Sequence, residues 1–217
     1  MIMKIAMLTV LTLASLTVSA APITISDRRC VPGSTDHVVK AVTDYQNYSK
    51  IPEATLSIVG MKILTMTKSQ EVKKVATSSD DSIVYIELRP LNFGEDKKDL
   101  FPRFFIRCRV SNLGPTSVRH ECHSLTKNDL SDFGRPGNVP MPFGLSQFDS
   151  ELQIESQSPS CVTGESQITY KLVMDPNDAD VSKIQMGSGF GSFPLPEDQF
   201  FKAYYQNFYN GWTKTVR

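Results

Sequence analysis

The sequence predicts an α+β domain in which a series of antiparallel strands precedes one long C-terminal helix. Segments that alternate apolar with polar residues recur between short turns, a pattern typical of half-buried strands. The C-terminal stretch instead repeats aromatic residues at helical spacing. A length of 217 residues and an apolar fraction of 40% suit a single globular domain with a substantial core.

The N-terminal segment is predicted to be a signal peptide. A short basic start is followed by an uncharged, mostly apolar stretch over 5–18, and small residues precede a cut between Ala20 and Ala21. The stretch is shorter than the roughly 20 residues that a spanning helix needs, although an uncleaved N-terminal anchor is the alternative. We therefore expect a signal peptide over 1–20, one domain over 21–217, and a secreted or periplasmic protein.

The balance of charge excludes two classes of partner. The 23 basic and 23 acidic residues give a formal net charge of zero. Nucleic-acid binders need a basic surplus to displace counterions, and polybasic membrane-surface proteins need one to attract anionic lipid. We therefore expect no nucleic-acid partner, while transient membrane contact and the oligomeric state stay open.

The secondary-structure elements can be predicted in chain order. A strand over 22–31 ends before a Pro-Gly pair, and a short helix follows, capped by Ser34 or Thr35 and ending between Asp44 and Tyr48. The later predicted strands cover 54–66, 70–77, 83–88, 101–110, 117–125, 149–156 and 167–174. The second of these later strands carries several charges, which favours an edge position.

Four cysteines behind a signal peptide favour disulfides. A turn over 113–116 folds the neighbouring strands into a hairpin that sets Cys108 opposite Cys122, within reach of a bridge. Cys30 and Cys161 form the remaining pair. Buried free thiols are the alternative interpretation.

The C-terminal helix carries a dense aromatic stripe. Pro194 and Pro196 stand at its predicted start. Its aromatic residues share one broad face: Phe200, Phe201, Tyr204, Tyr205, Phe208, Tyr209 and Trp212. The simplest interpretation is a helix packed on a sheet. Aromatic walls with polar tips also suit a lipid-like guest, because the rings offer apolar area and the hydroxyls can orient a polar group.

A long loop over 128–144 is the second ligand-site candidate. It combines proline and glycine with apolar residues that include Met141 and Phe143. Loops of this length are often functional, so the segment is interpreted either as a solvated crossover or as a lid over a cavity.

Catalytic and metal-binding patterns are weak. His120 and Cys122 share a strand face, but a disulfide at Cys122 would remove its thiolate as a metal ligand. No G-x-S-x-G motif is present. We therefore predict no catalytic residue, no metal and no cofactor, while a buried His120 or Glu87 inside a cavity would favour an enzyme.

The order of elements resembles the helix-grip fold of the START-like superfamily, also described as Bet v 1-like, polyketide cyclase/dehydrase-like or SRPBCC. The similarity is densest over 38–64 and in the closing helix over 194–212. The motif-like residues are Val42, Asp44, Tyr45, Tyr48 and Pro52. The resemblance implies a curved antiparallel sheet wrapped around the last helix, with a short helix pair near the N-terminus and a cavity for a hydrophobic ligand.

Three functions remain open. The leading hypothesis is an exported protein that binds or transfers a lipid or another hydrophobic small molecule. Its predicted ligand-binding residues are Phe201, Tyr204, Tyr205, Phe208, Trp212, Met141 and Phe143. The alternatives are a cyclase or hydrolase that uses the same cavity, and a structural domain with a filled core. The volume and polar lining of the space beneath the last helix distinguish the three.

Overall fold

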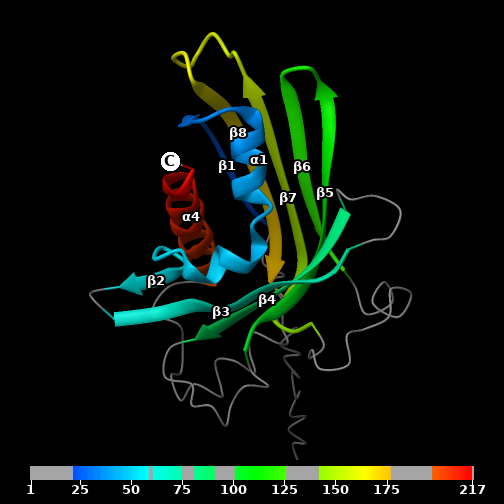
Figure 1. Ribbon diagram of the computed structural model, residues 1–217. Coiled ribbons are helices and arrows are strands. Elements are labelled where there is room, and N and C mark those ends of the chain that lie inside the picture. Colours follow the sequence, from blue (N-terminus) through cyan, green and yellow to red (C-terminus); the bar gives the residue numbers. More distant parts are fainter. Residues whose placement is uncertain are drawn as a thin grey trace, which may run out of the picture.

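The computed structural model describes residues 22–58, 61–74, 81–90, 101–125, 142–176 and 197–216. Within them, eight antiparallel strands form one sheet in the order β1-β8-β7-β6-β5-β4-β3-β2 (Figure 1). The strands are β1 Ile23–Pro32, β2 Thr55–Ile58, β3 Met61–Lys74, β4 Asp81–Pro90, β5 Arg103–Gly114, β6 Ser117–Ser124, β7 Leu145–Ser156 and β8 Glu165–Pro176. The predicted α+β class is confirmed. The expected signal peptide over 1–20 lies outside the described residues.

Two short helices and one long helix complete the described structure. They are the α-helix α1 Thr35–Val42, the 3₁₀ helix η1 Tyr45–Lys50 and the α-helix α4 Glu197–Thr215. The Ser34 side chain caps α1 by accepting a hydrogen bond from the His37 amide. The predicted helix pair near the N-terminus is thus confirmed.

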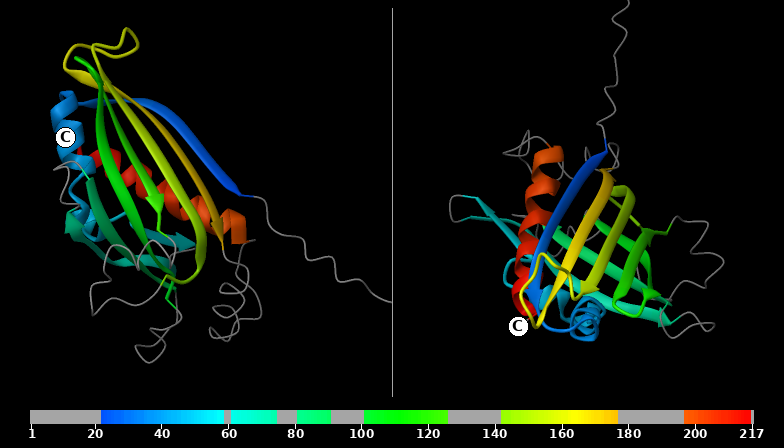
Figure 2. Two further views of the ribbon diagram at one scale, coloured as in Figure 1. Left: turned by 90° about the vertical axis from the view of Figure 1, so that its right-hand side faces the viewer. Right: turned by 90° about the horizontal axis from the view of Figure 1, so that it is seen from above.

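The sheet curls around α4 (Figure 2). This helix contacts both edge strands, β1 and β2, so the two ends of the sheet approach it from opposite sides. We call the face of the sheet toward α4 the concave face and the opposite face the convex face. On β4, Val84, Ile86 and Leu88 join the core on the concave face, while Tyr85 and Glu87 alternate onto the convex face.

One predicted strand is wrong in extent. The segment 54–66 is not continuous, because β2 and β3 form an antiparallel hairpin in which Leu56 pairs with Leu64 and Ile58 pairs with Met61. The sequence gives no change of period between the two strands, because apolar residues stand on both sides of the reversal. The segment predicted as a separate strand over 70–77 continues β3 as far as Lys74.

Candidate functional site

A small cavity lies between the concave face, η1 and α4. Its volume is about 60 Å³. From α4 it is lined by Tyr205, Phe208, Tyr209 and Trp212. Apolar residues of the central strands form most of the opposite wall, and no charged side chain is among its described lining residues. The aromatic stripe of the last helix therefore borders an apolar space as well as a packed core.

The predicted ligand-binding residues occupy three kinds of position. Tyr205, Phe208 and Trp212 line the cavity. Phe201 and Tyr204 are buried in the core but are not among the lining residues.

The two loop residues of the predicted set lie elsewhere. Phe143 forms an isolated antiparallel bridge with Arg103, whose guanidinium carbon lies 5.4 Å from the centre of the Phe143 ring. Met141 lies outside the described residues, so the structure describes only the C-terminal end of the predicted lid over 128–144.

Two tyrosine hydroxyls in the cavity wall lack hydrogen-bond partners. Within the described part of the chain, the Oη atoms of Tyr205 and Tyr209 are buried and unpaired. Burial raises the pKa of both phenols well above its ordinary value, so both stay neutral. Leaving such a group unpaired costs roughly 1–3 kcal/mol, and native structures contain few of them. Unpaired hydroxyls on residues that line an apolar space are therefore a signal for a ligand with a polar group.

A second polar feature of the cavity is a tyrosine–histidine pair. Tyr45 of η1 and His120 of β6 are both buried, and Tyr45 Oη lies 2.9 Å from His120 Nε2. Burial lowers the pKa of His120 to about 4, so its imidazole is neutral at pH 7. The pair can exchange a hydrogen bond with a guest but carries no fixed charge toward it.

A wider cleft lies outside the cavity, between α1, η1 and the C-terminal end of α4. Its volume is about 270 Å³, and His37, Lys40 and Asn47 contribute to its lining. Tyr48 and Trp212 line both this cleft and the inner cavity. These two side chains therefore lie between the inner and the outer space.

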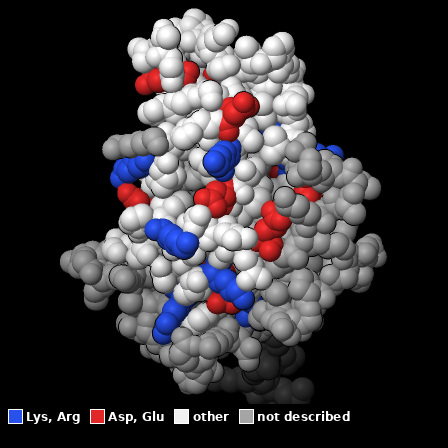
Figure 3. Space-filling view, in the orientation of Figure 1, with Lys and Arg blue, Asp and Glu red and all other residues white. Residues whose placement is uncertain are grey.

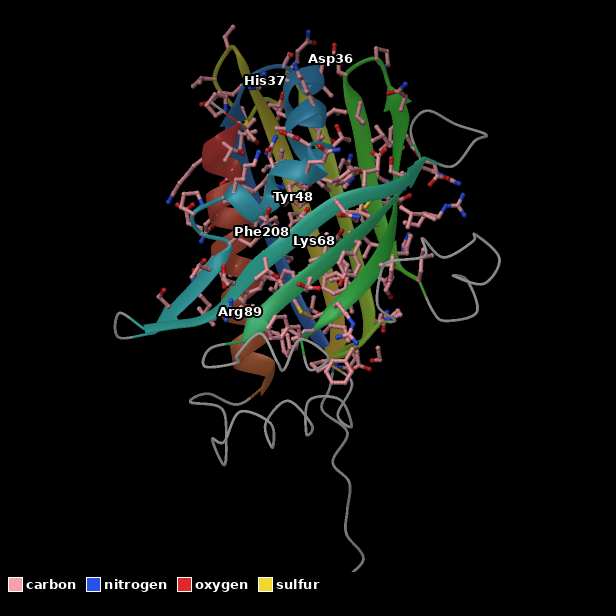
Figure 4. The ribbon with its side chains drawn as sticks, turned by 60° about the horizontal axis from the view of Figure 1, so that its bottom comes forward. Asp36, His37, Tyr48, Lys68, Arg89 and Phe208 are labelled. Atoms are coloured by element: carbon pink, nitrogen blue, oxygen red, sulfur yellow. A yellow bond between two sulfur atoms is a disulfide. The ribbon has the colours of Figure 1, made fainter. Side chains whose placement is uncertain are left out.

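Tyr48 is held in this position by neighbours on two elements. Its ring packs edge-on against Phe208 of α4, with 5.3 Å between the ring centres (Figure 4). Its hydroxyl donates a hydrogen bond to the carbonyl of Val42, and burial raises its pKa well above the ordinary value.

Both predicted disulfides are present. Cys108–Cys122 joins β5 to β6, and Cys30–Cys161 joins β1 to the loop between β7 and β8. The predicted hairpin register is confirmed, since Cys108 pairs directly with Cys122 across the strands.

Glu87, considered above as a cavity acid, lies on the convex face. It accepts a hydrogen bond of 2.7 Å from Tyr85 and is not among the cavity-lining residues. In the space-filling view of Figure 3, basic and acidic side chains are interspersed over the visible face of the protein, in keeping with the balanced charge. Among the described residues, no helix combines the length and apolar character needed to cross a membrane.

Sequence reasoning missed Tyr45, Tyr48 and Tyr209 as lining residues. Tyr209 lies four positions after Tyr205 on the same helical stripe, so extending the ligand set along that stripe finds it. Tyr45 and Tyr48 were identified only as residues of the family motif and not as ligand-binding residues. Nothing in the local sequence shows that η1 lies at one end of the cavity.

Comparison with known proteins identifies the fold. No family model and no curated protein matches the chain. Among solved structures, human StAR-related lipid transfer protein 5 is similar with a TM-score of 0.53 and 13% identity, over 89% of this chain and 74% of that one. The Zhui aromatase/cyclase from Streptomyces sp. R1128 is similar with a TM-score of 0.52 and 10% identity, over 90% of this chain and 94% of that one. The chain therefore has the START-like helix-grip fold.

Proposed function

We propose that this protein binds a lipid or another hydrophobic small molecule between the sheet and α4. The observation that carries the proposal is the pair of unpaired hydroxyls, Tyr205 and Tyr209, in the wall of an apolar cavity. The similar fold of a lipid transfer protein and of an aromatase/cyclase supports the same class of ligand.

The chemistry of the wall indicates an amphipathic guest. Apolar surface removed from water contributes roughly 25 cal/mol per Å², which favours an extended hydrocarbon or ring system against the aromatic residues. A hydroxyl or carbonyl on that guest would satisfy Tyr205 and Tyr209, whose pairing recovers part of their desolvation cost. The neutral pair of Tyr45 and His120 adds a second hydrogen-bonding position.

The guest needs more space than the inner cavity offers. Sites for drug-sized ligands run from about 300 to 1,000 Å³, whereas the inner cavity holds about 60 Å³. The outer cleft adds about 270 Å³, and only Tyr48 and Trp212 line both spaces. We infer that Tyr48 rotates away when the guest enters, so that the two spaces merge and reach the lower end of that range.

We also propose that the protein is secreted or periplasmic and transfers its guest. Two disulfides and the signal-peptide pattern support a secreted or periplasmic protein, because disulfides persist in oxidising compartments. A binding protein in such a compartment can carry a poorly soluble molecule between surfaces, with transient membrane contact at loading.

Native mass spectrometry after incubation with a total lipid extract tests the proposal. We expect a bound apolar species, and we expect cis-parinaric acid to bind with an affinity lowered about tenfold by the double variant Tyr205→Phe/Tyr209→Phe. The matched control is Tyr85→Phe, which removes a buried hydroxyl on the convex face and leaves affinity unchanged. The absence of any bound guest under these conditions would contradict the proposal and favour a structural domain.

An enzyme acting in the same cavity is the second candidate, and the buried Tyr45–His120 pair favours it. A neutral imidazole hydrogen-bonded to a phenol can move a proton during cyclisation or hydrolysis of a bound guest. The test is chemical change of the extracted guest over time. An enzyme loses conversion but keeps binding in His120→Gln, whereas a carrier shows no conversion in either form.

A further inference from the structure

The buried disulfide lies against a histidine. Cys108 and Cys122 face each other across β5 and β6 with 4.1 Å between their Cα atoms, and His120 precedes Cys122 by two residues on the same face. The distances from Cys122 Sγ to His120 Nε2 and Nδ1 are 3.6 and 4.0 Å. One ligand atom from each of the three residues lies within 4.8 Å of the others, and all three side chains are buried.

These distances are close to those of a zinc site. Zinc binds thiolate sulfur at about 2.3 Å and imidazole nitrogen at about 2.0–2.1 Å with tetrahedral angles, which places sulfur atoms about 3.8 Å apart and sulfur about 3.6 Å from nitrogen. His120 Nδ1, the ring nitrogen not paired with Tyr45, lies 4.0 Å from Cys122 Sγ, so a small shift of the ring brings it to that spacing. The main change that zinc requires is separation of the two sulfur atoms after their bond is broken.

The surroundings supply two further elements of a metal site. Cys122 and His120 line the inner cavity, which would supply the space for an ion and for a water at its fourth position. Tyr45 Oη lies 2.9 Å from His120 Nε2, and it can accept the Nε2 proton while Nδ1 binds the ion. Metal-bound histidines regularly donate their second ring N–H to an acceptor, most often a carboxylate, a backbone carbonyl or water, and the tyrosine hydroxyl would take that place here.

We propose that reduction of the Cys108–Cys122 disulfide creates a buried zinc site made of Cys108, Cys122 and His120. A dithiol reductant delivers two electrons and two protons to the disulfide and becomes a disulfide itself, leaving two thiols in the protein. Zinc then binds the two sulfur atoms as thiolates and releases their two protons to solvent. The oxidised protein lacks the site, since neither sulfur is a thiolate.

The second disulfide provides the internal comparison. Cys30 and Cys161 have Glu165 as their neighbour in place of a histidine, and all three are half-buried. A thiolate–imidazole set is the more usual zinc environment, and burial protects it from competing water. We therefore assign the site to the Cys108–Cys122 pair.

Cobalt(II) absorption tests the proposal, because thiolate ligation gives an intense charge-transfer band and tetrahedral geometry gives strong d–d bands. The full chain is reduced in urea with a phosphine and refolded with or without cobalt or zinc, so burial does not protect the disulfide from the reductant. We expect both bands in the reduced wild type, displacement of cobalt by zinc, and no bands in the oxidised protein.

Variants assign the ligands. We expect His120→Gln to weaken cobalt binding about tenfold or more and Tyr45→Phe to weaken it to a smaller degree. The matched control is His37→Gln, which removes an exposed histidine on α1 and leaves the bands intact. The Cys30→Ser/Cys161→Ser variant keeps the bands if it folds, and the His120→Gln comparison stands on its own if it does not.

Two results overturn the proposal. One is a reduced protein without a charge-transfer band, whether or not it refolds. The other is a band that His120→Gln leaves unchanged, which excludes His120 as a ligand. None of these readouts depends on a hydrophobic guest, so the zinc site and the lipid-binding proposal fail or succeed independently.

Discussion

The two faces of the sheet differ in whether their polar groups have hydrogen-bond or ion-pair partners. On the convex face, Asp81 receives hydrogen bonds from Arg107 and Arg109, and Arg119 forms ion pairs with Glu121 and Glu151. On the concave side, polar groups are few, and two hydroxyls in the wall formed by α4 have no partner among the described residues.

This difference distinguishes a face whose polar groups have a structural role from a face that is a candidate binding site. The charged groups named above on the convex face have partners within the sheet, on the same strand or a neighbouring one, so no ligand is needed to explain them. Arg119 Nε makes no hydrogen bond of good geometry, but it lies 3.2 Å from Glu151 in an ion pair. A cavity wall with unpaired hydroxyls is a local violation of the rule that buried polar groups are bonded, and such violations are concentrated at functional sites. Four predictions test whether the contrast is real, in order of decreasing effect.

The largest effect concerns His120. Its pKa is 6.5 in the unfolded chain and about 4 in the folded protein, so between these values the unfolded state binds a proton that the folded state rejects. Stability conferred by the neutral ring is complete above pH 6.5 and falls by about 3 kcal/mol as the pH is lowered to 4.

We expect His120→Gln to remove this part of the pH dependence. Tyr45 is the hydrogen-bond partner of the ring, and the described cavity lining holds no charged group that could replace the effect. Urea unfolding between pH 7 and pH 4 measures the slope, with His37→Gln as the exposed control. An unchanged slope in His120→Gln contradicts the burial argument.

The next effect concerns Asp81 on the convex face. Hydrogen bonds from Arg107 hold the pKa of this buried carboxyl below its ordinary value, so the ion pair stabilises the protein above that value and is lost as the pH falls through the lowered pKa. We expect Asp81→Asn to lower the free energy of unfolding by about 2 kcal/mol at pH 7, the range for hydrogen bonds to charged groups. Chemical unfolding measures it, and a loss under about 0.5 kcal/mol would show that the convex network is not structural.

The third prediction has the opposite sign. We expect Tyr205→Phe to raise the free energy of unfolding by about 1 kcal/mol, because it removes an unpaired buried hydroxyl and keeps the ring. The same change should weaken binding of cis-parinaric acid. Tyr45→Phe is the matched comparison, and it should destabilise by about 1 kcal/mol since it leaves His120 without its partner. Loss of stability in Tyr205→Phe would show that its hydroxyl is satisfied in solution.

Much of the fold follows from local pattern. Alternation predicted the hairpins, and the turn over 113–116 fixed a register that the Cys108–Cys122 disulfide confirms. The aromatic spacing predicted α4. The sequence pattern did not predict the reversal between β2 and β3, because apolar residues continue on both sides of it and the periodicity does not change.

The candidate site was harder to predict for two physical reasons. Alternation shows that Val84 and Tyr85 point to opposite faces but not which face meets α4, since that depends on packing with a helix at the far end of the chain. An unpaired hydroxyl is a property of the surroundings: Tyr45 and Tyr205 are the same residue type, and only the first has a partner.

The smallest effect should come from Arg119 on the convex face. Its side chain is 36% exposed, and the Glu121 and Glu151 side chains that it contacts at 3.4 and 3.2 Å are 32% and 45% exposed. Pairs in this environment are screened by water and salt, so we expect Arg119→Ala to change the free energy of unfolding by no more than about 0.5 kcal/mol. Affinity for the fatty-acid probe should stay unchanged, since Arg119 lies on the face opposite the cavity. A loss above about 1 kcal/mol, or weaker binding, would mean that the two faces are coupled and that the concave site cannot be treated separately from the sheet that carries it.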